Sequence, residues 1–374
     1  MNQRESSISY IPELDGIRAL AILLVMIYHT GIPIFKGGFI AVDIFFVLSG
    51  FLISSILIKE YDTKDKINLQ YFYIKRILRL APSLLILLTT IFIISYFRLF
   101  NQTEDNYRSI LLTLFYSSNW VRAFNQFYMG ILSHTWSLAI EEQFYILWPV
   151  VLIPLLKIRS RKKVVILLCI LALSSWLLRI FLIFRGAPVE RLYNGLDTRA
   201  DALLTGCILA VIQSSEILKN SIKRGRICVR MIAVGALFCY FAVLFSISWR
   251  NLNNYYWLAS VIQILTAFLI LHSNSSESSP IKKILAFRPI VWIGSISYGL
   301  YLWHDPIYEI MRTCKFSQYS IATIGSLITF LIASLSYYLV EKPVLSLKRK
   351  LSRNTPDKEL QEKILDEKEE FVKL

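Results

Sequence analysis

An arginine and a histidine stand near the two ends of an apolar stretch, DGIRALAILLVMIYHT at residues 15–30. Arg18 and His29 are eleven residues apart, so a helix places both on one face, with about 16 Å between them along its axis. A neutral histidine there is suited to accept a hydroxyl proton near neutral pH, and it is equally suited to a structural hydrogen bond. Arg18 also fits a simple anchor at a membrane surface.

Three basic residues stand close together in a second stretch, YIKRILRLAP at residues 73–82. Arg76 and Arg79 are three residues apart and share a helix face beside Lys75. Two guanidinium groups held as a fork match a phosphate or pyrophosphate group. The same residues fit a cytoplasmic membrane anchor, so the pattern indicates either an anchor or a site for an anionic nucleotide.

Two adjacent acids enter a third apolar stretch, HTWSLAIEEQFYILWP, as Glu141 and Glu142. If a helix has begun by Ser137, Glu141 lies one turn from Tyr145 and shares a face with it. Acidic side chains are not natural membrane anchors, so charges at this place are functional candidates. His134 and Trp136, at the start of the same stretch, are candidate substrate contacts.

Two further stretches carry candidate polar groups. In DTRADALLTG, Asp197 and Asp201 are one helical turn apart with Arg199 between them, and capping of a helix by Asp197 is the simpler interpretation. In ISYGLYLWHDPI, His304 and Asp305 lie in an aromatic segment before a proline. A kinked helix with an aromatic belt explains the proline and the rings, but not the histidine.

The composition sets the class of protein. The 374 residues are 55% hydrophobic and 18% charged, and their mean hydropathy is +0.52, too apolar for an ordinary soluble enzyme. The net charge of +15 arises mostly from basic residues in short connectors, which argues against nucleic-acid binding. The five cysteines are scattered without metal-ligand spacing, and no removable signal peptide is recognisable at the polar N-terminus.

These patterns predict an all-α integral membrane bundle of about ten transmembrane helices. The expected spans lie near 17–35, 38–58, 80–99, 139–156, 164–184, 200–214, 231–248, 256–272, 290–311 and 320–340. The stretch 108–128 is broken by polar residues, so it is expected to be re-entrant or interfacial. We expect one membrane domain over 1–345 and a charged cytoplasmic tail over 346–374.

The distribution of basic residues predicts the orientation. Of the 41 lysines and arginines, 30 fall on one side of the expected spans and 11 on the other. Because cytoplasmic connectors carry the excess of Lys and Arg, both termini are predicted to be cytoplasmic.

Taken together, the five stretches resemble the acyltransferase-3 family of bacterial integral membrane acyltransferases, over nearly the whole chain to about residue 343. GGFIAVDIFFVLSGFLI and the closing YYLVEKP add to the resemblance. It implies a ten-span protein of the bacterial inner membrane that moves an acyl group, usually acetyl, from cytoplasmic acetyl-CoA to a carbohydrate hydroxyl. It marks Arg18 and His29 as the essential pair, and Arg76 and Arg79 as contacts for the donor. Lys75, Ala81 and Asp305 depart from the usual pattern, which leaves donor and acceptor details open.

The chemistry implied by this resemblance assigns a role to each stretch. His29 is expected to be the general base, and Arg18, Trp136 or His304 to stabilise the oxyanion. Arg76 and Arg79, together with the neighbouring Lys75, would bind the anionic end of CoA. The acids Glu141 and Glu142 are expected to orient His29 or to bind the acceptor, as are Asp197 and Asp201. No metal is expected, and direct transfer is preferred over an acyl-histidine relay.

Three questions stay open at this point. A polytopic exporter or flippase of a lipid-linked glycan would use the same intramembrane charges, although no inverted repeat is visible. A membrane scaffold would leave the placement of His29 and the two acids unexplained. The acceptor is not named by the sequence: lipopolysaccharide, capsule, exopolysaccharide, peptidoglycan or a small metabolite all fit, with membrane lipid as the surrounding partner.

Overall fold

The computed structural model describes residues 10–97, 103–215, 225–275 and 277–344. The helices are α1 (Pro12–His29), α2 (Ala41–Lys64), α3 (Leu69–Tyr96), α4 (Thr103–Leu114), α5 (Ser118–Ala123), α6 (Trp136–Leu156), α7 (Arg161–Phe184), α8 (Val189–Asn194), α9 (Leu196–Gln213), α11 (Arg226–Ser246), α12 (Ala259–Ser273), α13 (Pro280–Leu285), α14 (Arg288–Ser295), α15 (Ser297–Thr313), α16 (Gln318–Ser320) and α17 (Ser326–Ser336). Short 3₁₀ turns cover Gly38–Ile40 and Gly130–Thr135, and π-helical turns cover Asn254–Leu258, Ile321–Gly325 and Tyr337–Glu341. No strand occurs among these residues, which confirms the all-helical class. The tail predicted over 346–374 lies outside the described residues.

Among the described residues, seven helical segments are long and apolar enough to cross a membrane, so the chain is a multi-pass membrane protein. They are Gly38–Lys64, Leu69–Tyr96, Gly130–Leu156, Arg161–Phe184, Arg226–Ser246, Asn254–Ser273 and Gln318–Val344. The other three expected spans correspond to the helices α1, α9 and α15, which are not among these seven segments. Helices α1 and α9 each carry three charged residues, and α15 has only 17 residues. The count of ten and the orientation stay predictions.

Two expected boundaries need correction. The stretch 290–311 is not one helix, because the helix is interrupted at Ile296, which separates α14 from α15. The third expected span, 80–99, begins too late, and its residues up to Tyr96 belong to α3. That helix already begins at Leu69, where the Asn68 side chain accepts a hydrogen bond from the Tyr71 amide. The stretch 108–128 contains the second half of the short helix α4 and the whole of the short helix α5.

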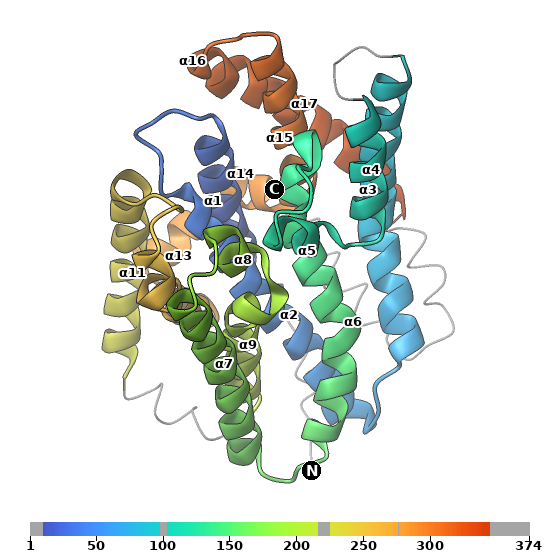
Figure 1. Ribbon diagram of the computed structural model, residues 1–374. Helices are drawn as coiled ribbons and strands as arrows, with labels where there is room; N and C mark the ends of the chain where they lie inside the picture. Colours follow the sequence, from blue (N-terminus) through green and yellow to red (C-terminus); the bar gives the residue numbers. More distant parts are fainter. Residues whose placement is uncertain (1–9, 98–102, 216–224, 276, 345–374) are drawn as a thin grey trace.

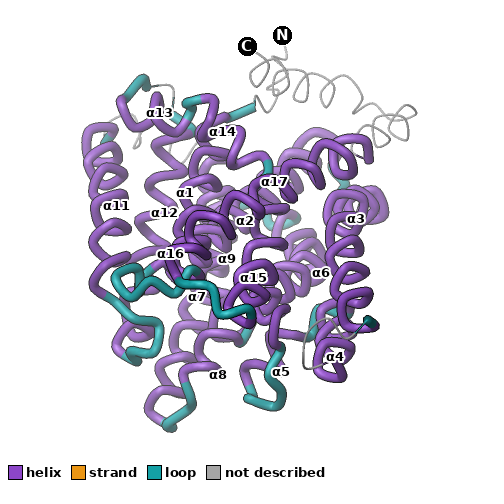
Figure 2. Tube along the Cα trace, turned by 90° about the horizontal axis from the view of Figure 1, so that it is seen from above, coloured by secondary structure: helices purple, strands orange, loops and turns teal. Residues whose placement is uncertain are grey.

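Helix α2 lies inside the bundle, with α11 and α3 at opposite edges in both views (Figures 1 and 2). In the apolar stretch of α2, 72% of the residues are buried, against 22% in α7. Large apolar side chains such as Leu85, Phe181 and Phe238 are at least half exposed on the outer helices. An apolar exterior around a polar, buried interior is the arrangement that a lipid environment favours.

Glycines allow the central helices to approach each other closely. A Cβ atom added at Gly206 of α9 would lie 2.0 Å from the Val47 carbonyl oxygen of α2, and one at Gly50 would lie 1.9 Å from the Leu203 oxygen. Helix α1 meets α14 in the same way, at Gly294. Because small residues drive close helix packing in membranes, these contacts fix the positions of α1, α2 and α9.

A methyl group at Gly206 tests this packing. Gly206→Ala is expected to destabilise the protein by about 1–3 kcal/mol, since the backbones must separate. Gly235→Ala on α11 is the matched control: its added Cβ meets nothing within 4 Å, and alanine favours a helix by up to about 1 kcal/mol. Thermal melting of the purified protein in detergent should give a lower melting temperature for Gly206→Ala than for the wild type, and no decrease for Gly235→Ala. Equal melting temperatures would contradict the packing argument.

Candidate active site

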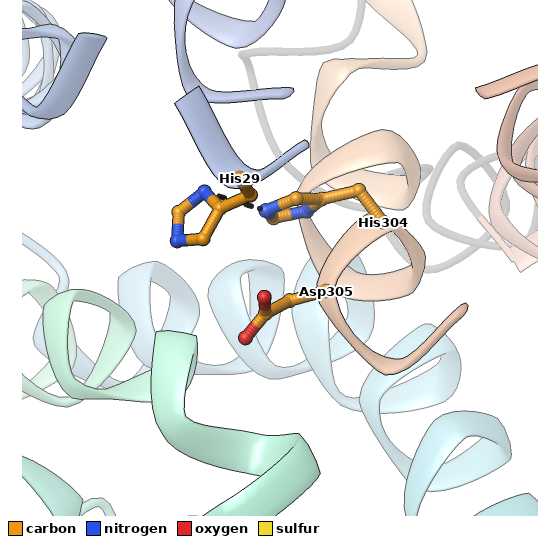
Figure 3. A group of neighbouring side chains, drawn as sticks. All are labelled: His29, His304 and Asp305. Atoms are coloured by element: carbon orange, nitrogen blue, oxygen red, sulfur yellow. Dashed lines mark hydrogen bonds between the residues drawn. The ribbon is translucent and has the colours of Figure 1, made fainter. Parts of the chain in front are cut away.

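The last residue of α1, His29, meets His304 of α15 in the interior. His29 Nδ1 lies 3.3 Å from His304 Nε2, and the two rings are edge to face at 4.9 Å between centroids (Figure 3). Helix α1 ends here because Gly31 turns the chain with a positive φ of 79° and Pro33 follows. The end of one helix thus delivers the histidine to the side of another.

The backbone around both rings fixes their tautomers. His304 Nδ1 faces the carbonyl oxygens of Leu300 and Tyr301 at 3.1 and 2.7 Å, and carbonyls only accept, so Nδ1 carries the proton and Nε2 a lone pair. His29 Nδ1 faces the Val25 carbonyl at 2.9 Å and the lone pair of His304, so it also carries a proton. His29 Nε2 is therefore the unprotonated nitrogen of its ring, and it points away from His304 (Figure 3).

A carboxylate and a third histidine complete this group, which we call the histidine cluster: His29, His134, His304 and Asp305. One ligand atom each from His29, His304 and Asp305 lies within 4.8 Å of the others. Asp305 Oδ2 lies 3.3 Å from His134 Nδ1. His134, His304 and Asp305 are 2%, 0% and 4% exposed, whereas His29 is half-buried. His29 is thus the imidazole of the cluster that a reactant can reach.

Neighbouring polar groups hold the cluster in place. The Tyr301 hydroxyl donates to the His134 carbonyl at 2.7 Å and lies 2.5 Å from the Ser137 hydroxyl. Arg312 donates to the His29 carbonyl and pairs with Glu309 at 2.5 Å. These bonds tie α1, α6 and α15 together around the rings.

A second polar group, the arginine cluster, comprises Arg18, Arg76, Arg79, Glu141 and Glu142. Arg76 pairs with Glu142 at 3.2 Å, and its guanidinium lies 3.2 Å from the centroid of the Tyr145 ring. Glu141 accepts a hydrogen bond from the Ser49 hydroxyl at 2.7 Å. The shared face of Glu141 and Tyr145 is confirmed, since α6 begins at Trp136.

The charges of this cluster are not equally compensated. Arg18 pairs with Asp15 at 2.9 Å. Arg79 is exposed and, within the described part of the chain, has no hydrogen bond or ion pair. The positive charges of Arg18 and Arg76 act on Arg79. Lys75 lies over the Tyr71 ring, with its ammonium 3.5 Å from the centroid. Arg79 is thus the cation most available to an anionic ligand.

Two helices connect the clusters. On α1, Arg18 and His29 lie about 16 Å apart along the axis, as the sequence predicts. On α6 and the turn before it, His134, Ser137 and Glu141 follow at spacings of three and four residues, which places them along one helix face. We call this line of polar side chains, His134, Ser137 and Glu141, the polar path.

The remaining candidates are engaged elsewhere. Asp197 pairs with Arg191, and although the N-cap residue of α9 is Gly195, the Asp197 carboxylate accepts a hydrogen bond from the Thr198 amide in the first turn. Arg199 pairs with Asp43 at 2.8 Å, and Asp201 with Arg179 at 2.8 Å. The Trp136 ring packs on Tyr193, 4.5 Å between centroids. Each of these residues has a partner outside both clusters, which favours a structural role for the three ion pairs, two of which are buried.

Sequence reasoning missed several members of the site. Asp305 is noted there beside His304 and as a departure from a family pattern, and Ser49 only within the stretch GGFIAVDIFFVLSGFLI, while Tyr301 and Arg312 have no predicted role. Tyr301 precedes His304 by three residues on one helix face, a spacing that predicts a shared surface. The other contacts join residues distant in sequence, which no local pattern reveals.

Three ligand atoms within 4.8 Å are a spacing at which a metal ion can be held. The inward-facing nitrogen of His304 fits a metal ligand, because its other nitrogen faces backbone carbonyls. His29 Nδ1, however, faces that nitrogen at hydrogen-bonding distance. The expectation that no metal takes part stays a prediction.

Comparison with known proteins finds related sequences. A family model described as an acyltransferase domain matches residues 11–340. The chain is 35% identical over 347 residues to a peptidoglycan O-acetyltransferase, OatA, of Listeria monocytogenes, which covers 90% of this chain and 56% of that protein. It is 38% identical over 352 residues to an O-acetyltransferase, OatA, of Staphylococcus aureus, with 90% and 57% covered. The chain thus spans little more than half the length of these relatives. No solved structure matches it.

Chemical modification tests which histidine is reachable. Diethyl pyrocarbonate attacks unprotonated imidazole nitrogens, so His29 should be modified before His134 and His304, which are buried. His272, 1% exposed and outside the cluster, is the matched control. Peptide mass spectrometry after increasing exposure times gives the order of modification. Modification of His134 or His304 ahead of His29 would contradict the geometry.

Proposed function

Because this chain belongs to the acyltransferase-3 family, we propose that it is a membrane O-acetyltransferase with His29 as its general base. It takes an acetyl group from cytoplasmic acetyl-CoA and passes it to a hydroxyl of a cell-wall or lipid-linked carbohydrate. The observation that carries this proposal is the half-buried His29 ring, whose Nε2 is unprotonated and points away from His304. A base for a hydroxyl needs such a nitrogen within reach of the substrate.

The transfer follows from that nitrogen. His29 Nε2 removes the hydroxyl proton while the sugar oxygen attacks the thioester carbonyl carbon. The new C–O bond forms, the C–S bond breaks, and the imidazolium returns the proton to the departing thiolate of CoA. His29 is thus unchanged after each turnover, and direct transfer needs no acyl-enzyme.

The arginine cluster is the proposed donor site. CoA carries phosphates, and guanidinium groups bind phosphates through charge-assisted hydrogen bonds. Arg79 is supported in this role by its exposure and by its lack of a carboxylate partner among the described residues. Arg76 is held by Glu142 beside it. The extended arm of CoA would then follow the polar path toward His29.

The proposed location and acceptor rest on the relatives. Both OatA proteins are named as O-acetyltransferases, and that of Listeria monocytogenes as acting on peptidoglycan. We therefore take a cell-wall glycan as the first acceptor to test and the bacterial cytoplasmic membrane as the location. An exporter of glycans has no comparable support.

Radiolabel transfer tests the function. Membranes that contain the protein, supplied with acetyl-CoA labelled in the acetyl group and with purified peptidoglycan, should form an alkali-labile acetyl ester on the glycan. His29→Gln should lower the rate by about 10²–10⁴-fold, because the base is lost. The control is His272→Gln, which replaces a buried histidine hydrogen-bonded to Ser279 and should keep full activity.

Two results would count against this proposal. Full transfer by a folded His29→Gln variant would remove His29 from the mechanism. Glycan export by vesicles without any acyl donor, together with no transfer by the wild type, would favour a transporter instead.

A further inference from the structure

We propose that Asp305, which lies beside His29, His134 and His304, is a positioning residue that stabilises His29 after it has taken the substrate proton. The inference rests on the proposed role of His29 as base. It assigns a role to a carboxylate that touches neither donor nor acceptor in the mechanism above.

The surroundings of Asp305 are unusual for a buried acid. Its side chain is 5% exposed, and in the described part of the chain no lysine or arginine pairs with it. The nearby arginines are engaged: Arg312 pairs with Glu309, and Arg122 donates to the Ser133 carbonyl at 2.7 Å, acting on Asp305 only at longer range. A buried anion without a cation is costly.

Three imidazoles face this one carboxylate, and they differ in their freedom to become charged. His304 has Nδ1 toward two carbonyls and Nε2 toward His29 Nδ1, so neither nitrogen is free for another proton. His134 contacts Asp305 at 3.3 Å and is fully enclosed. His29 has the unprotonated nitrogen that the substrate reaches. The negative charge of Asp305 is thus matched best when His29 is an imidazolium.

The attraction between Asp305 and His29 can contribute to catalysis because it differs between the ground state and the transition state. The attraction between Asp305 and His29 is weak while His29 is neutral and strong once the hydroxyl proton has moved to it. Asp305 does not take the proton, which returns from His29 to the thiolate. The carboxylate is buried among the rings before the reaction, so little reorganisation is needed when the charge forms.

Two measurements on the full-length protein test the proposal. The first needs no substrate: the pH dependence of His29 modification by diethyl pyrocarbonate. The charged groups that face His29 are His304, Asp305 and Arg312 from α15 and His134 from the preceding turn of α6. Asp305→Asn removes the only anion among them. The midpoint of His29 modification should therefore move to lower pH by about 1 unit, the effect of one close opposite charge.

The second measurement is the rate of acetyl transfer. Asp305→Asn should lower kcat about 10- to 100-fold and leave KM for acetyl-CoA within about twofold, because the charge acts after binding. Asp305→Glu should restore part of both effects. Asp62→Asn, in an ion pair with Arg161 that belongs to neither cluster, is the control expected to change neither.

The outcomes are distinguishable. An unchanged midpoint in a folded Asp305→Asn protein would overturn the proposal, whatever its kcat. A stoichiometric metal ion that copurifies with the wild type and is lost from Asp305→Asn would also overturn it, since Asp305 would then be a ligand. A shifted midpoint in a protein that does not use acetyl-CoA would support the role of Asp305 and reject the donor.

Discussion

The hydrogen bond between His29 and His304 is the contact on which the site depends. It joins the end of α1 to the side of α15, and it sets which nitrogen of His29 carries a proton. Farther along α1, the Asp15 backbone lies close against Gly294 of α14. The Val25 carbonyl and the Nε2 lone pair of His304 together place the proton of His29 on Nδ1, which leaves Nε2 unprotonated.

The distribution of charge separates structural residues from the proposed functional ones. Inside the bundle, Arg199 and Asp43 compensate each other, as do Arg179 and Asp201. Arg79 and Asp305 are different. Among the described residues, no carboxylate lies within ion-pair distance of Arg79, and no lysine or arginine lies within ion-pair distance of Asp305. On our account each is compensated during the reaction, Arg79 by the phosphates of the donor and Asp305 by the protonated His29.

The sequence permitted part of this description. Periodicity places Arg18 and His29 on one helix face, and the acids of α6 on the face of Tyr145, because both are local properties of a helix. The pairing of His29 with His304 joins residues 275 positions apart and depends on tertiary packing. Asp197, Arg199 and Asp201 appear functional from sequence alone, since their partners Arg191, Asp43 and Arg179 cannot be identified without the fold. Helix α3 begins earlier than hydropathy predicts, because its first turns are polar.

The central claim is a division of labour: the arginine cluster binds the donor and the histidine cluster performs the chemistry. Equilibrium binding of labelled acetyl-CoA to purified protein in detergent tests it most directly. The account predicts that Arg79→Gln raises Kd about 10- to 100-fold, the loss of one charge-assisted contact, while His29→Gln leaves Kd unchanged. Unchanged binding in Arg79→Gln, or equal weakening in both variants, would contradict the account.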